Sequence, residues 1–174
     1  MTTPRTDPPF AADEATTLLT FLDYFRDTLR RQTEGLGAEE LRRTLGPGSL
    51  TLGGLLKHLA FVEGYWFRHV LAGADLGEPW ASVDWRATPD WDLDSAADDA
   101  PEELRALLDA EVASADAIVR EVLTRGGLDA LAVRPRHGEH PSLRWIMVHM
   151  VEEYARHCGH ADLIRESIDG AVDL

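Results

Sequence analysis

The sequence of 174 residues has few cysteines and no long apolar stretch, and each shortage excludes a class of protein. Its single cysteine, Cys158, cannot form a disulfide within the chain and suits a reducing compartment. No stretch approaches the roughly 20 apolar residues that a membrane-spanning helix needs. The first ten residues are polar and proline-rich, unlike a signal peptide. We therefore expect a soluble cytoplasmic protein without a membrane partner.

Positive charge is also scarce. The chain has 17 Lys and Arg against 31 Asp and Glu, a formal net charge of −14, and Lys57 is its only lysine. Binding to nucleic acids and to anionic membranes is driven by Lys and Arg side chains. The charge therefore argues against both as partners.

Apolar residues make up 44% of the chain, and low-complexity tracts are absent from the sequence. This composition is typical of a globular protein, and the length suits one domain with a substantial core. We expect a flexible tail at residues 1–10 and a single domain at residues 11–174.

Apolar residues recur at three- and four-residue spacing in four segments, which predicts amphipathic helices at about 12–32, 51–71, 101–125 and 142–167. Thr51 is a plausible N-cap, and Pro101 is suited to the first turn of a helix. No run predicts a strand. Four long amphipathic helices predict an all-α protein, a four-helix bundle with a long connection between its second and third helices.

That connection, residues 74–100, is acidic, lacks periodicity and contains Trp80, Trp85 and Trp91. Long connections inside a compact domain are uncommon and often functional. Each indole is a large apolar group with one donor, so its burial is favourable. We expect the segment to pack against helix ends as a strap, with a mobile lid as the alternative.

The helical segments also carry a possible metal-ligand set. Glu153 and His157 lie one turn apart on one helix face and can bind a single ion. If the helix that carries His58 packs alongside, the set becomes two imidazoles and a carboxylate with open coordination positions, as in catalytic metal sites. The alternative is a surface Glu–His pair and an interfacial histidine, and spacing alone does not decide between them.

A helical wheel orders the candidates around the apolar stripe of residues 142–167. His157 lies about 50° from the centre of the stripe, Glu153 about 90°, His160 about 110° and His149 about 130°, all on one flank. Glu63 falls within the stripe of residues 51–71 and needs a partner there. A buried hydrogen bond or ion pair is favoured for Glu63, with a role near the site as the alternative.

Two runs carry a resemblance to a known family: SLTLGGLLKHLAFVEGYWFRHVL (49–71) and SLRWIMVHMVEEYARHCGHADLIRESIDG (142–170). They resemble the DinB superfamily of metalloenzymes, and more narrowly an actinobacterial branch labelled as a domain of unknown function. The chain is also similar to mycothiol-dependent maleylpyruvate isomerase, a relative in that superfamily.

The resemblance implies a four-helix bundle of up-down-down-up order and a divalent metal, zinc first and nickel second. By position, the ligands are His58, Glu153 and His157. Many members have a histidine where this chain has Glu153, so the departure favours the isomerase-like subgroup. His149, His160 and Glu63 then become candidates for supporting the ligands or facing the substrate.

The resemblance further implies a metal-dependent S-transferase or isomerase that uses a low-molecular-weight thiol such as mycothiol and a small-molecule substrate. One alternative is a metal-dependent hydrolase, in which the ion activates water. The other is a non-catalytic bundle that binds a metal or small ligand and pairs as a homodimer.

Overall fold

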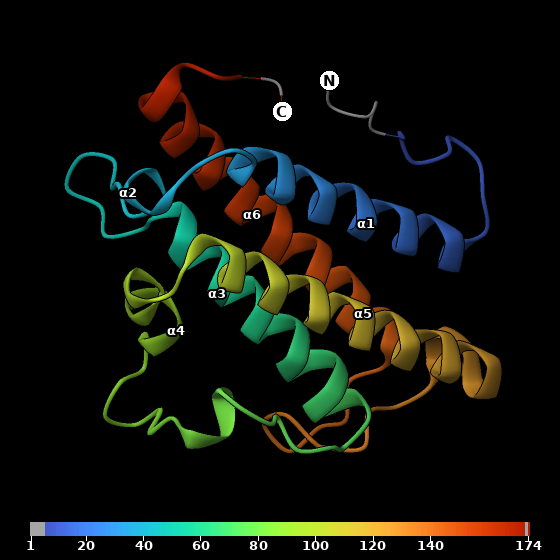
Figure 1. The fold of residues 1–174 in the computed structure, drawn as a ribbon. Coiled ribbons are helices and arrows are strands. Elements are labelled where there is room, and N and C mark those ends of the chain that lie inside the picture. Colours follow the sequence, from blue (N-terminus) through green and yellow to red (C-terminus); the bar gives the residue numbers. More distant parts are fainter. Residues whose placement is uncertain (1–5, 173) are drawn as a thin grey trace.

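The computed structural model describes residues 6–172 and 174, which form helices joined by loops and no strand (Figure 1). The prediction of an all-α protein is confirmed. The long helices are α1 (Glu14–Thr33), α3 (Leu52–Glu63), α5 (Pro101–Gly126) and α6 (Leu143–Asp169), and the shorter elements are α2 (Ala38–Leu41), η1 (Gly64–Leu71), η2 (Trp80–Ser82), α4 (Trp91–Asp94), η3 (Ser95–Asp98) and η4 (Gly127–Asp129).

The ends of the long helices follow local chemistry. The Thr51 side chain accepts a hydrogen bond from the Gly54 amide at 2.9 Å and caps α3. Pro101 occupies the first turn of α5, and Gly170 closes α6 with φ of 77°, a left-handed conformation that glycine adopts without strain. The predicted helix at 51–71 is α3 continued by η1, whose turns are of the wider π type.

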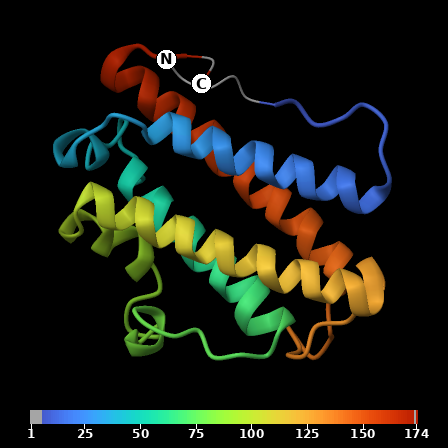
Figure 2. The ribbon, with the colours of Figure 1, turned by 45° about the vertical axis from the view of Figure 1, so that its right-hand side comes forward.

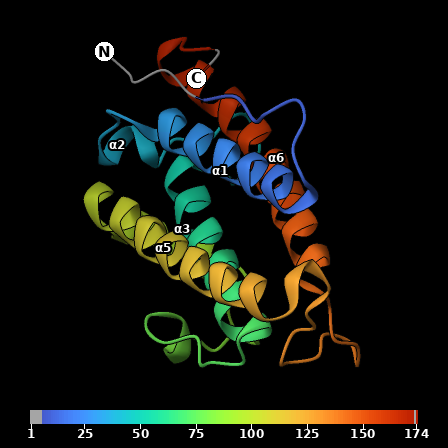
Figure 3. The same ribbon diagram turned by 90° about the vertical axis from the view of Figure 1, so that its right-hand side faces the viewer.

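The helices α1 and α6 lie side by side and run in the same direction (Figure 3). Near their starts, Arg144 is paired with Glu14. Near their ends, Arg165 Nη1 donates to the Gln32 carbonyl at 3.1 Å and to the Glu34 carbonyl at 3.0 Å. Salt bridges and carbonyl capping thus hold this pair at both ends.

The helices α3 and α5 form a second pair of common direction, opposite to the first. A Cβ on Gly53 would lie 3.4 Å from Leu104, near the start of each helix. Further along, Arg68 Nη2 contacts Glu111 Oε2 at 2.7 Å. Between the pairs, α3 and η1 pack against α6, and the ring centroids of Trp66 on η1 and Trp145 on α6 are 5.2 Å apart.

The core is built from the predicted apolar stripes. Every residue of both stripes is buried: Leu52, Leu55, Leu59, Val62, Trp66 and Val70 on α3 and η1, and Leu143, Met147, Met150, Tyr154 and Ala161 on α6. Cys158 is likewise a buried residue, and its thiol donates to the Phe25 carbonyl at 3.5 Å. These stripes leave the flanks of α3 and α6 free for polar groups.

A polar cluster inside the core joins one residue from each long helix. Arg26 of α1 makes a two-pronged pair with Glu63 of α3, at 2.7 and 2.8 Å. The same guanidinium contacts Asp116 of α5 at 2.9 Å, and the Tyr154 hydroxyl of α6 donates to Glu63 Oε1 at 2.9 Å. The buried ion pair favoured for Glu63 is therefore present.

Residues 74–100 form a strap that packs along α3 and reaches α5 at Trp80, on the side away from α1 (Figure 2). Trp80 is 1% exposed and donates from Nε1 to Glu111 Oε1 at 3.2 Å. Trp85 stacks on Phe61 with ring centroids 4.3 Å apart. The prediction that the tryptophans anchor this segment is confirmed, although their partners lie along the sides of the helices rather than at helix ends.

The predicted tail is described only in part. Residues 6–10 contain no helix and are largely exposed, and the earlier residues of the tail lie outside the described residues. No helix among the described residues has the length and apolar character needed to cross a membrane.

Candidate metal centre

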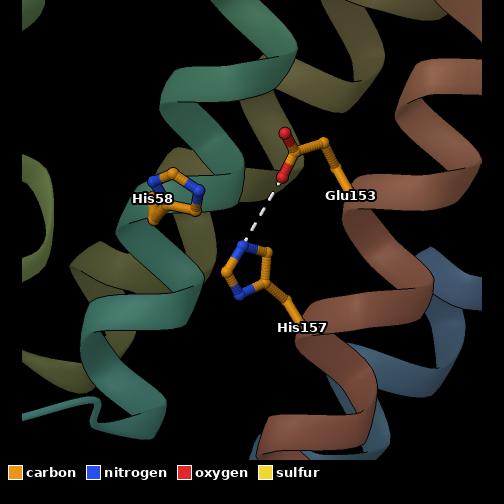
Figure 4. A group of neighbouring side chains, drawn as sticks. All are labelled: His58, Glu153 and His157. Atoms are coloured by element: carbon orange, nitrogen blue, oxygen red, sulfur yellow. Dashed lines mark ion pairs between the residues drawn. The ribbon is translucent and has the colours of Figure 1, made fainter.

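His58 on α3 and Glu153 and His157 on α6 point toward one another across the gap between the two helices (Figure 4). His157 Nε2 lies 3.5 Å from Glu153 Oε2, and the His58 and His157 ring centroids are 4.8 Å apart. One ligand atom from each of the three residues lies within 4.8 Å of the others. The structure thus brings together the three residues whose metal binding the sequence predicts.

The chemistry of this donor set fits a divalent ion of the zinc type. Two imidazole nitrogens and one carboxylate oxygen form a common catalytic zinc set, with bonds of about 2.0–2.2 Å and at least one open position. Such bonds place ligand atoms at most about 4.4 Å apart. With one ligand atom of each residue within 4.8 Å of the others, the three side chains are close to this spacing.

Asp92 supports His58 and was missed by the sequence reasoning. Its Oδ2 lies 2.7 Å from His58 Nδ1, and its side chain is 5% exposed. With Nδ1 engaged, Nε2 is the nitrogen left for an ion. The only sequence signal for Asp92 was that it is an acidic residue next to Trp91. Residues 74–100 contain several other acidic residues, so this signal did not single it out.

His149 and His160 lie on α6 beside the triad, by which we mean His58, Glu153 and His157. The helical wheel had placed both on this flank of α6. His149 Nε2 is 3.4 Å from Glu153 Oε1, and its ring stacks on Trp145 with centroids 5.1 Å apart. His160 Nδ1 lies 3.5 Å from His157 Nδ1. His149 and His160 thus contact Glu153 and His157, respectively, at an atom other than the one by which those two residues contact each other.

A second group of His149, Glu152 and Glu153 is also close enough to hold an ion. All three residues lie on one helix, and Glu152 is exposed at the surface. The first set joins two helices and is less exposed, so it is the better candidate. Glu63, another predicted neighbour of the site, is engaged with Arg26 and Tyr154 in the core.

The charge of Glu153 is favoured by its neighbours. The hydrogen bond with His157 lowers the pKa of the Glu153 carboxyl below its usual range, and this outweighs the opposing effect of partial burial. His149 and His58 act in the same direction as His157. A carboxylate held in its ionised form is the form that binds a cation.

An apolar hollow of about 140 Å³ adjoins the site on the side of His160. Its other lining residues are Leu45, Gly48, Leu50, Leu163 and Ile164. A larger cavity of about 530 Å³ lies between α1 and α5, and none of the triad lines it. A small apolar group could therefore lie next to His160 in the smaller hollow.

Comparison with known proteins adds the family. The model of the mycothiol-S-transferase family matches residues 17–170. The chain belongs to the mycothiol-S-transferase family. The resemblance to DinB-like proteins inferred from the sequence is thereby confirmed.

For this mycothiol-S-transferase family member, a solved structure gives support for the fold alone. A conserved protein from Enterococcus faecalis superposes with a TM-score of 0.56 over 92% of this chain and 100% of that chain, at 16% identity. No curated protein matches the chain significantly in sequence.

Proposed function

We propose that this protein transfers the sulfur of mycothiol to an electrophilic small molecule, at a divalent metal held by His58, Glu153 and His157. The observation that carries the proposal is the convergence of these three donors between α3 and α6 in a chain of the mycothiol-S-transferase family. A divalent ion with an open position lowers the pKa of a bound thiol and so supplies a thiolate at neutral pH.

The proposed transfer is a displacement at carbon that takes place between α3 and α6. The thiol loses its S–H proton to the solvent, its sulfur forms a bond to the electrophilic carbon, and the leaving group departs with the electron pair of the broken bond. His58, Glu153 and His157 would hold the ion between α3 and α6, and the ion's open position would accept the thiol there. The hollow beside His160 supports an electrophile with a small apolar group.

Metal content and thiol transfer test the proposal together. We expect the purified protein to bind about one zinc-type ion per chain and to accelerate the reaction of mycothiol with a chlorobimane, whose fluorescence rises as sulfur displaces chloride. The His58→Ala variant should lose both properties, whereas Leu131→Ala, at an exposed loop residue, should keep both. Metal binding with ester hydrolysis but no thiol transfer would favour the hydrolase, and metal binding without turnover would favour a binding protein.

The order of the helices in the bundle and the oligomeric state are also proposals. We propose that the four long helices form the up-down-down-up bundle, which the common direction of α1 with α6 and of α3 with α5 supports. The single domain at residues 11–174, the homodimer, the choice of zinc over nickel and the cytoplasmic location stay predictions. Light scattering on the purified protein tests the homodimer.

A further inference from the structure

The strap reaches the candidate metal centre through one buried carboxylate. Asp92 lies on α4, and its Oδ2 is 2.7 Å from His58 Nδ1. A carboxylate that is 5% exposed is costly unless hydrogen bonds satisfy it. The His58 ring supplies such a bond, so the contact joins a ligand candidate on α3 to a segment some 34 residues later in the chain.

We propose that Asp92 is a positioning residue for His58, an inference that rests on the metal site proposed above. An ionised carboxylate only accepts hydrogen bonds, so Nδ1 of His58 must carry the hydrogen in this contact. The Nε2 lone pair then faces Glu153 and His157, as one ring nitrogen of His58 does in Figure 4. Metal-binding histidines commonly have such a carboxylate partner, which fixes the ring and strengthens the ligand.

The backbone that carries Asp92 is itself fixed on α3. A Cβ on Gly54 would lie 3.1 Å from the Leu93 carbonyl, so the two backbones are in close contact there. Lys57 Nζ lies 2.5 Å from Asp99 Oδ2 and 4.3 Å from the centroid of the Trp91 ring. Lys57 thus holds the strap on both sides of Asp92, one residue before His58.

This arrangement gives the strap a second purpose beyond covering the core. Its contacts hold Asp92 in place before any ion binds, so the His58 ring does not have to be ordered by the ion itself. Ordering a side chain costs conformational entropy, and a ring already fixed avoids that cost at the moment of binding. Metal affinity should therefore depend on the Asp92 carboxylate.

Two variants of Asp92 and two controls test this role. We expect Asp92→Ala to weaken Zn²⁺ binding about 10–100-fold, measured by competition with a chromogenic chelator. Asp92→Asn should lose less, because its amide oxygen still accepts from Nδ1. The control Asp94→Asn removes the same charge from an exposed position of α4 and should bind as the wild type does. The second control, Asp99→Asn, removes the negative charge that pairs with Lys57 but leaves Asp92, and it should lose less than Asp92→Ala.

Two spectroscopic readouts separate positioning from folding. Asp92→Ala should alter the absorption spectrum of bound Co²⁺, and the ¹⁵N shifts of the metal-free protein should show that His58 loses its preference for hydrogen on Nδ1. Helicity by circular dichroism identifies any variant that fails to fold, and Asp92→Asn then carries the test.

The outcomes separate this inference from the proposed function. Equal affinity in Asp92→Ala and Asp94→Asn, or a loss in Asp99→Asn as large as in Asp92→Ala, would overturn the role of the carboxylate. A wild type that binds no metal would refute the proposed function instead. In that case the ¹⁵N shifts still decide whether Asp92 sets the hydrogen position on His58.

Discussion

At the scale of single residues, His157 and His149 differ in what they contact on the same flank of α6. His157 is 12% exposed and faces both His58 and Glu153, whereas His149 is 22% exposed and lies between Glu153 and Trp145. The helical wheel had likewise placed His157 closer than His149 to the centre of the apolar stripe. Their substitutions should therefore have unequal effects on metal binding.

We predict that His157→Ala abolishes metal binding, because two remaining protein ligands are too few to hold a divalent ion. His149→Ala should keep the ion and lose about 10–100-fold in affinity or activity, as is usual for a group that supports a ligand. Bound metal per chain, measured by elemental analysis of both variants, checks this. Equal loss would mean that His149 is itself a ligand.

Glu111 offers a prediction on pH. Burial raises the pKa of its carboxyl above the ordinary value of 4.5, against the lowering effects of the Trp80 hydrogen bond and of Arg68. The folded protein then binds this proton more tightly than the unfolded chain. The resulting stabilisation is present below about pH 4.5 and is lost as the pH rises through the folded-state pKa.

We therefore expect the free energy of unfolding of the wild type to fall relative to that of Glu111→Gln as the pH rises from about 4 to about 8. Urea denaturation at several pH values measures the difference. Glu166→Gln, at an exposed position of α6, serves as the control and should differ little from the wild type at each pH. A difference that is constant or grows in the opposite direction would contradict the raised pKa.

At the scale of elements, the strap depends on Trp80 more than on its other tryptophans. Trp80 is 1% exposed, whereas Trp85 and Trp91 are only partly buried. We predict that Trp80→Ala lowers the free energy of unfolding by about 3–5 kcal/mol, the usual cost of deleting a large buried side chain. The half-exposed Trp145 gives the control: Trp145→Ala should cost clearly less in the same urea titration. Equal costs would mean that the strap is not anchored through Trp80.

The long helices could be read from the sequence because their signals are local. Apolar periodicity and the caps at Thr51 and Pro101 predicted elements that differ from the observed ones by about two residues at their ends. The helix α2 and the short turns of the strap were missed, because four-residue helices are too short to show a period.

The candidate site could be predicted only in part for the same reason. Glu153 and His157 are neighbours by helix geometry alone, and His58 required only that α3 pack on α6. Asp92 could not be identified, because its burial depends on how a non-periodic segment folds back on α3. The π-type turns of η1 likewise had no signal in the sequence.

At the scale of the whole molecule, the cluster around Arg26 ties the four long helices to one another. Removing one partner of a buried ion pair leaves the other charge uncompensated, which typically costs about 3–5 kcal/mol. We predict such a loss in the free energy of unfolding for Arg26→Ala. Arg30→Ala, which removes a largely exposed pair with Asp109, should cost at most about 1 kcal/mol. Calorimetry and urea denaturation of both variants measure this contrast, and similar losses would show that the cluster contributes no more than a surface pair.

The separation of the three proposed metal ligands along the chain has a consequence for biosynthesis. His58 emerges from the ribosome about a hundred residues before His157, and at about 5–20 residues per second that interval lasts about 5–20 s. For most of it the nascent chain offers His58 without Glu153 and His157, and a single imidazole is a weak ligand for a divalent ion. The complete donor set exists only once α6 has been made and has docked on α3. Metal loading of the proposed site is therefore expected to be a late event, in which the finished fold, rather than the growing chain, selects the ion.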